Sequence, residues 1–170
     1  MSIVKRSPQN TNFLSRNRFK LIFPRAPNTE YNVQGINIPD ITAEPVTQAT
    51  PFVPIYVTGV TTQFSPVHLN IICDEDLLAW QEMHDWVIGS SFPRSFKEYA
   101  EAKKEGLYTD MSLMLMSNGN VPTFQFTFIH AFPFSLGAID MTTEDDGSEM
   151  VTFPVTFRYT DYTIKRHKNP

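Results

Sequence analysis

The chain has 170 residues, enough for one domain whose core folds without disulfides or a structural metal. Its 14 basic and 18 acidic side chains give a net charge of −4, so the chain as a whole lacks the basic footprint of a nucleic-acid-binding protein. The single cysteine, Cys73, excludes an internal disulfide and a cysteine metal cluster, and its place after an apolar run predicts a buried thiol. We find no secretory signal and no apolar run near the roughly 18 residues of a membrane span. We therefore expect no membrane association and folding in a reducing cytoplasm.

Residues 1–17 are polar and basic and follow no clear period, which predicts an N-terminal arm. Two interpretations of this arm stay open. It is either a mobile tail or a segment that docks on a neighbouring subunit through Phe13 and Leu14.

Two strands are expected next. Residues 18–23, RFKLIF, alternate between apolar and basic side chains, as a half-buried strand does. Residues 31–38, YNVQGINI, change phase at Gly35, which indicates a bulge. Because a Pro/Asn-rich turn separates the two runs, the sequence predicts a hairpin of 18–23 with 31–38.

Residues 39–66 combine five prolines with many β-forming side chains. Proline has no amide to give to a central ladder, so this segment is predicted to be an edge or an arm that projects over about residues 41–60. The alternative is a long loop folded back on its own core. A projecting arm would expose an apolar patch suited to a contact with another protein, formed by Phe52, Val53, Ile55 and Tyr56.

A strand, a sharp turn and a helix are predicted in succession over residues 67–89. The strand is VHLNIIC, Asp74 is the expected N-cap, the helix spans 75–88 and Gly89 ends it. The spacing of three and four residues places one apolar stripe toward the core, made of Leu77, Trp80, Met83 and Val87.

A short charged helix is expected at residues 95–106, with Gly106 ending it. Strands 111–117 and 123–130 follow, joined by a hairpin turn at Asn118-Gly119-Asn120.

The last part of the chain is predicted to be irregular from residue 131 to a turn at Asp146-Gly147. A final strand occupies residues 149–164, and its Pro154 indicates an edge or a bulge. These elements give a mainly β, α+β domain at residues 18–162, followed by a basic C-terminal tail at 163–170. We expect an antiparallel β-barrel or two-sheet sandwich with one dominant flanking α-helix.

No pattern of catalytic or metal-binding residues stands out. The four histidines have no metal-ligand spacing, and Asp74-Glu75-Asp76 lacks the glycine and distal glutamate of a calcium loop. Motifs for a serine nucleophile, for phosphate binding and for dinucleotides are absent from the sequence. The sequence therefore predicts no enzyme activity, no cofactor and no metal.

The order of the segments resembles the tail tube proteins of contractile-tailed bacteriophages over about residues 17–160. The most specific part is the strand, acidic turn and Trp-containing helix in FSPVHLNIICDEDLLAWQEMHDWVIG, followed by the AFPFSLG segment. No single motif carries the resemblance alone. Its other segments are RFKLIF, YNVQGINIPDI, TPFVPIYVTG, SLMLMSNGN and VTFPVTFRYTDY.

This resemblance implies a small β-barrel with a flanking helix, whose copies form hexameric rings. The rings would stack into a hollow tube that conducts DNA during genome ejection. The implied partners are a sheath protein, baseplate tube-initiator proteins, a tape measure protein and DNA that passes the lumen without tight binding. The implied location is the virion tail, after assembly in the host cytoplasm.

Other functions stay open from the sequence. A tube initiator or baseplate-junction protein of the same fold is the nearest alternative, and type VI secretion tubes are related. From different classes, a small-ligand-binding barrel and an enzyme with scattered catalytic residues remain alternatives.

Overall fold

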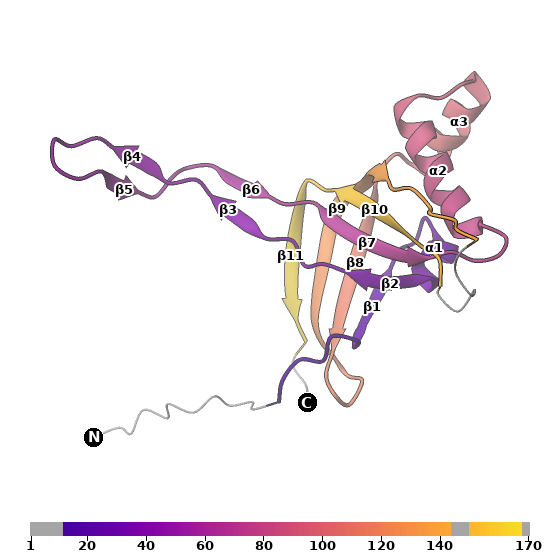
Figure 1. Cartoon of the computed structure of the whole chain (residues 1–170), viewed down its shortest axis with the longest axis horizontal. Helices are drawn as coiled ribbons and strands as arrows, with labels where there is room; N and C mark the ends of the chain where they lie inside the picture. Colours follow the sequence, from indigo (N-terminus) through magenta and orange to yellow (C-terminus); the bar gives the residue numbers. More distant parts are fainter. Residues whose placement is uncertain (1–11, 144–149, 168–170) are drawn as a thin grey trace.

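The computed structural model describes residues 12–143 and 150–167. In this part of the chain a seven-stranded antiparallel sheet has the order β1-β8-β9-β10-β7-β2, with β11 also paired to β9 (Figure 1). The strands are β1 (Phe19–Ile22), β2 (Val33–Ile36), β7 (Val67–Ile72), β8 (Thr109–Met116), β9 (Pro122–Leu136), β10 (Thr152–Arg158) and β11 (Asp161–Arg166).

The long strand β9 belongs to two halves of the sheet. Its first part pairs with β8 and β11, and its last part pairs with β10. Between them His130 has a φ of 54°, and its amide donates to the Asp110 carboxylate over 3.0 Å. This bend folds the sheet into a barrel that is left open between β1 and β2, because no described backbone pairing joins those two strands.

The core lies inside this barrel and is rich in aromatic rings. Phe23, Phe128, Phe153 and Phe157 are fully buried, together with apolar side chains from β7 and β8. Phe23 contacts Phe157 edge to face, with 5.4 Å between ring centroids. Such pairs stabilise a core beyond the area that they bury.

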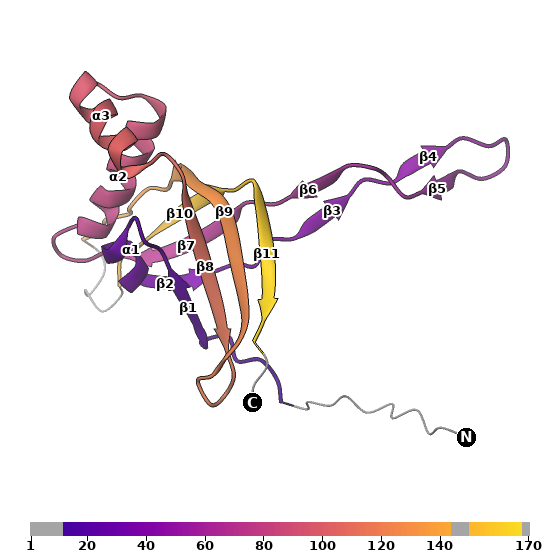
Figure 2. The same cartoon turned by 180° about the vertical axis from the view of Figure 1, so that it is seen from behind.

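Three helices complete the described fold: α1 (Pro27–Tyr31), α2 (Leu78–Ser91) and α3 (Phe96–Glu105). Helix α1 lies between β1 and β2 and contacts α2, while α3 contacts α2 and stands away from the sheet (Figure 2). The Glu82 carboxylate of α2 accepts hydrogen bonds from the Asn28 and Thr29 amides of α1. It thereby satisfies amides that the first turn of a helix leaves free.

The helix expected at 75–88 begins three residues later and extends past Gly89, which is buried within it. Leu77 precedes the helix in the left-handed region, with a φ of 53°. The Asp74 carboxylate accepts hydrogen bonds from the amides of Leu78 and Ala79. The predicted N-cap position is wrong, because Leu77 occupies it, although Asp74 still binds the amides of the first turn; the predicted stop at Gly89 is also wrong.

The apolar stripe of α2 is also displaced from the expected one. Met83 is buried as predicted, but its buried companions are Ala79 and Trp86. Trp80 is only half-buried and stacks on His84, with 5.0 Å between ring centroids. Ala79, Met83 and Trp86 also recur at spacings of four and three, so the face that reaches the core is turned slightly from the predicted one.

The predicted hairpin of residues 18–23 with 31–38 is wrong. β1 pairs with β8, and β2 pairs with β7. Pro27 starts a helical turn between them, where the sequence indicated only a turn. The bulge expected at Gly35 is present as a register shift between Val33 and Gly35.

The C-terminal half departs from expectation at three places. β9 continues through residues 131–136, which were predicted to be irregular. Pro154 lies in the interior strand β10, where its carbonyl accepts the Gly137 amide over 2.7 Å. β11 reaches Arg166, so residues 163–166 pair with β9 and are not part of a tail.

The remaining elements agree with the sequence. The turn at residues 118–120 joins β8 to β9, and α3 ends before Gly106, whose φ is 91°. The predicted turn at Asp146-Gly147 lies outside the described residues. A mainly β antiparallel fold with a dominant flanking helix is confirmed.

Trp86→Ala should destabilise the subunit more than Trp80→Ala. The Trp86 ring is 2% exposed, contacts Phe23 and Phe157, and donates its indole N–H to the Leu107 carbonyl. Removing it should lower the free energy of unfolding by roughly 3–5 kcal/mol. Thermal and denaturant melting of both variants measures the difference, and a larger loss for Trp80→Ala would contradict this assignment of the core face.

Candidate assembly surface

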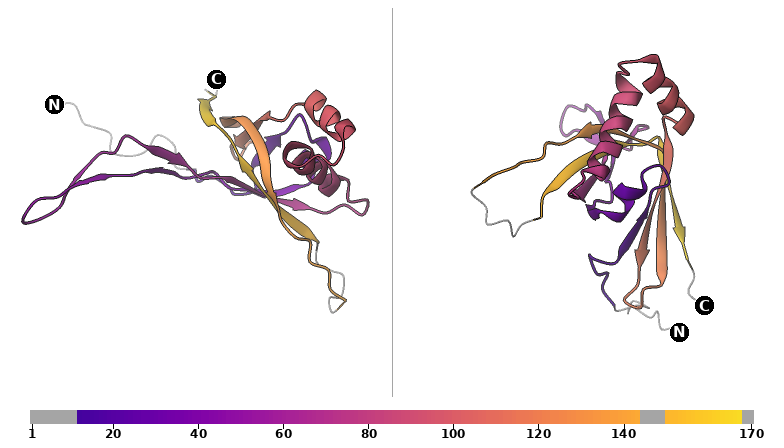
Figure 3. Two further views of the ribbon diagram at one scale, coloured as in Figure 1. Left: turned by 90° about the horizontal axis from the view of Figure 1, so that it is seen from above. Right: turned by 90° about the vertical axis from the view of Figure 1, so that its right-hand side faces the viewer.

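The most conspicuous surface is a two-stranded arm that projects from the barrel (Figures 1 and 2). Its inner part pairs β3 (Ile41–Ala43) with β6 (Thr62–Phe64), and its outer part pairs β4 (Val46–Gln48) with β5 (Ile55–Val57). The left view of Figure 3 shows it pointing away from the barrel. The arm is therefore an ordered hairpin and not a loop folded back on the core.

The root of the arm is held by aromatic contacts. Phe64 contacts the rings of Tyr159 and Tyr162, at centroid distances of 6.1 Å and 5.6 Å. The Tyr159 hydroxyl donates to the Ser65 carbonyl over 2.9 Å, and the Ser65 amide donates to the Asp40 carbonyl. These contacts tie both strands of the arm to the corner between β10 and β11.

Two titratable groups at this root have shifted pKa values. Partial burial, with smaller effects from neighbouring charges, raises the pKa of Tyr159 to about 12. A hydrogen bond from the Ser65 side chain lowers the pKa of Asp40.

The middle of the arm depends on a glycine. A Cβ added at Gly59 would lie 1.6 Å from the Glu44 carbonyl oxygen, so no other residue fits while the two strands approach this closely. The contact falls between the inner and outer strand pairs, where the hairpin narrows (Figure 1).

The outer arm is apolar and exposed. All four residues predicted as an interface lie there, and their exposed fractions are 95% for Phe52, 66% for Val53, 52% for Ile55 and 70% for Tyr56. Sequence reasoning missed further exposed apolar side chains of the same arm, which are Ile41, Val46, Val57 and Val60. Their β-branched character was visible, but it does not show which side chains face solvent.

Phe13 and Leu14 lie elsewhere, beside the β8–β9 turn and the end of β11. They line a groove of about 690 Å³ together with Leu115, Met116 and Phe124. Both side chains are exposed, Phe13 to 91%. Their docking on a neighbouring subunit stays a prediction.

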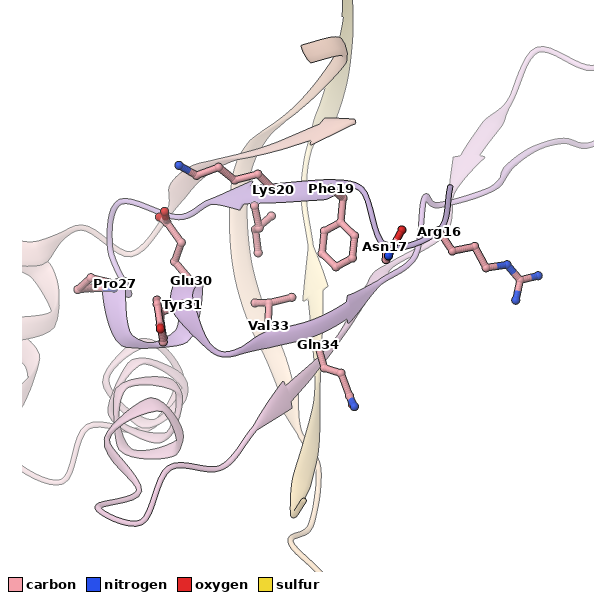
Figure 4. Close-up of a pocket in the computed structure, with 10 residues that line it drawn as sticks. Arg16, Asn17, Phe19, Lys20, Pro27, Glu30, Tyr31, Val33 and Gln34 are labelled. Carbon is pink, nitrogen blue, oxygen red and sulfur yellow. The ribbon is translucent and has the colours of Figure 1, made fainter. Parts of the chain in front are cut away.

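A second groove, of about 760 Å³, lies at the opening of the barrel between β1 and β2. Figure 4 shows Phe19 of β1 and Val33 of β2 pointing toward one another across it. Lys20 and Gln34 point away from the groove, and Glu30 of α1 lies at its end. No sequence pattern indicated this groove, because it depends on two strands that are not paired.

The described residues offer no constellation for other chemistry. They contain no group of three or more His, Cys, Asp or Glu side chains that could hold a metal ion. Within the same residues, no helix is long and apolar enough to span a membrane. Cys73 is half-buried, and burial with the nearby Asp74 charge raises the pKa of its thiol.

Several solved structures have a fold similar to that of this chain. The anti-feeding prophage tube-terminating cap has 14% identity and a TM-score of 0.69, covering 98% of this chain and 100% of that one. A chain of the six-fold symmetrised anti-feeding prophage baseplate has 15% identity and a TM-score of 0.56, with coverages of 92% and 97%. A chain of the PVC extracellular contractile injection system sheath-tube complex has 11% identity and a TM-score of 0.58, with coverages of 92% and 94%.

The fold is therefore that of subunits found in contractile tube assemblies. The profile of the family described as phage tail tube protein matches residues 28–165. The chain belongs to the phage tail tube protein family, a family of structural proteins. Among curated proteins, no sequence matches it.

Tyr159→Phe should loosen the root of the arm. The variant leaves the Ser65 carbonyl without its donor, which should cost about 1 kcal/mol. We expect faster hydrogen exchange in β3 and β6, with β8 and β9 unchanged. If β3 and β6 exchanged at the same rate in the wild type and the variant, the Tyr159–Ser65 hydrogen bond would not be what holds the arm.

Alkaline titration tests the same residue independently. Because folding raises the Tyr159 pKa from about 10 to about 12, its contribution to stability is full below pH 10 and is lost as pH rises to about 12. Tyr159→Phe should remove this part of the alkaline loss. A tyrosinate absorbance difference between the two proteins with a midpoint near pH 10 would contradict the shift.

Proposed function

We propose that this protein is the tube subunit of a phage tail, forming hexameric rings that stack into a hollow tube. The lumen conducts DNA during genome ejection. The observation that carries the proposal is the ordered apolar arm, which reaches beyond its own barrel and has no partner surface within the described residues.

The arm is suited to joining successive rings. Burying a large apolar side chain contributes about 1.5–3 kcal/mol, so Phe52, Val53, Ile55 and Tyr56 together supply several kcal/mol per contact. A disordered segment would lose much of this to ordering, but here both strand pairs are already formed.

The chemistry of the arm favours a protein partner over nucleic acid. Residues 45–62 contain no charged side chain, so they offer no cation for phosphate groups. The net charge of −4 also fits a lumen through which DNA passes without tight binding. A sheath protein, baseplate tube-initiator proteins and a tape measure protein are the other expected partners.

The location that follows is the virion tail, with assembly in the host cytoplasm. Likeness to the tube-terminating cap supports a second role, a ring that ends or begins a tube. The two roles differ in one property, since a tube subunit elongates and a cap or initiator stops at a ring.

Electron microscopy and mass photometry of the purified full-length protein test the function. We expect hexameric rings, and tubes when a baseplate seed is added. Rings that never elongate would indicate a cap or initiator. A monomer at high concentration, with and without the seed, would contradict the proposal.

Removing the outer arm should separate ring formation from stacking. The variant deletes residues 46–57 and joins Pro45 to Thr58 by a Gly-Ser turn, which leaves β3 and β6 paired. We expect an unchanged melting temperature and rings that do not stack. Tubes of normal length from this variant would show that the arm is not the stacking element.

A matched control distinguishes the arm from exposed apolar surface in general. Phe52→Ser with Val53→Ser should reduce tube length, whereas Phe92→Ser should not, although Phe92 is 75% exposed at the end of α2. Equal effects of both variants would point to solubility and not to stacking.

A further inference from the structure

The turn between β8 and β9 contains Asn118-Gly119, the only Asn-Gly pair in the sequence. Both residues are exposed, and the turn is tight, because the Asn120 amide donates to the Ser117 carbonyl over 2.9 Å. An asparagine that precedes a glycine can lose its side-chain amide when the next backbone nitrogen attacks it. Glycine permits the attack because it has no Cβ to shield its nitrogen and the least restricted backbone.

Two hydroxyl groups contact the atoms that would react. The Ser15 hydroxyl donates to the side-chain carbonyl oxygen of Asn118 over 3.0 Å. A donor in this position stabilises the negative charge that develops on the oxygen when its carbon is attacked. The Ser117 hydroxyl oxygen accepts from the Gly119 amide over 3.3 Å, so the proton that has to leave points at a group that can relay it to water.

Cationic side chains near the turn favour both the reaction and its product. Arg18 donates to the side-chain oxygen of Asn120 on the same turn, and Arg166 lines the groove of about 690 Å³ that Asn118 also lines. None of the described residues that line this groove is acidic. The attack creates negative charge and hydrolysis leaves a carboxylate, and a neighbouring cation stabilises each of them.

We propose that Asn118 is a site of spontaneous deamidation, a covalent modification that the Ser15 hydroxyl promotes. The Gly119 nitrogen forms a bond to Cγ of Asn118, and the bond from Cγ to Nδ2 breaks. The Gly119 amide proton ends on the departing NH₂ group, which leaves as ammonia, and a cyclic imide remains. Water then opens the imide at either carbonyl and gives aspartate or isoaspartate at position 118. The proposal does not depend on the proposed tube.

The modification changes the charge and the length of the turn. Aspartate strengthens the contact with the N-terminal segment, because the hydrogen bond from Ser15 becomes charge-assisted and Arg18 lies on the same turn. Isoaspartate adds a methylene group to the backbone between the two strands. It therefore weakens the bond that closes the hairpin, which the Ser117 amide donates to the Val121 carbonyl over 2.8 Å. An aged sample is then a mixture of two forms with different turns.

Peptide mass spectrometry of the full-length protein, incubated at neutral and at mildly alkaline pH, tests the site. Amide loss should concentrate at Asn118, with Asn120 as the internal control because a valine follows it. The rate should rise by up to about tenfold per pH unit, since the attacking amide must lose its proton. Backbone fragmentation should identify isoaspartate beside aspartate. No amide loss at Asn118, or equal loss at Asn120, would overturn the proposal.

Variants separate the contribution of the fold from the reactivity of any Asn-Gly pair. Ser15→Ala removes the donor to the reacting oxygen, so it should slow amide loss at least about threefold in the folded protein and leave the rate unchanged in the urea-denatured chain. Gly119→Ala should slow it at least about tenfold in both states.

Ser135→Ala is the matched control, because Ser135 is an exposed serine of β9 away from the turn, and the rate should stay at the wild-type value. Both serine variants should fold, since neither side chain lies in the core. Equal rates for Ser15→Ala and the wild type in the folded protein would overturn the role of Ser15, as would an equal slowing by Ser135→Ala.

Discussion

The bend in β9 is the constraint on which the rest of the fold depends. One strand of 15 residues pairs with β8 and β11 up to Ala131 and with β10 from Phe132 onward. Without the bend those pairings would form one flat sheet, and the apolar face would have no opposite wall. With it, Phe128 on one half and Phe157 against the other half lie in the same core. The Asp110 carboxylate satisfies the His130 amide at the bend, where the regular ladder is interrupted.

The same bend explains where the exposed surfaces lie. It turns β11 away from β10, so that β11 ends one sheet with a free edge, and it leaves β1 and β2 facing each other without pairing. The arm leaves the barrel beside this corner, where Tyr159 and Tyr162 hold Phe64. The arm and the free edges of β1 and β11 therefore have separate positions in the structure, and each can be altered without removing a core residue.

Much of this architecture could be predicted from local sequence, and the failures share one cause. Alternation in RFKLIF and VTFPVTF identified the strands, and proline content identified residues 41–60 as a segment unsuited to an interior strand. Which strands pair is a long-range property. The adjacent runs at 18–23 and 31–38 suggested a hairpin, but Glu82, some fifty residues away, stabilises α1 between them. The prediction of an edge or a bulge at Pro154 failed for a related reason. A proline indicates only that one amide is missing, and β10 accommodates Pro154 between two neighbouring strands.

The candidate surfaces show the same division. Phe52, Val53, Ile55 and Tyr56 could be named because prolines and apolar residues alternate in one short segment. The free edges of β1 and β11 and the groove at Phe19 and Val33 could not, because they become surfaces only when the order of strands is known. A subunit that folds before it assembles must keep such edges soluble while they are free. Lys20 and Lys165 fit that requirement, since charged side chains on edge strands oppose indiscriminate pairing.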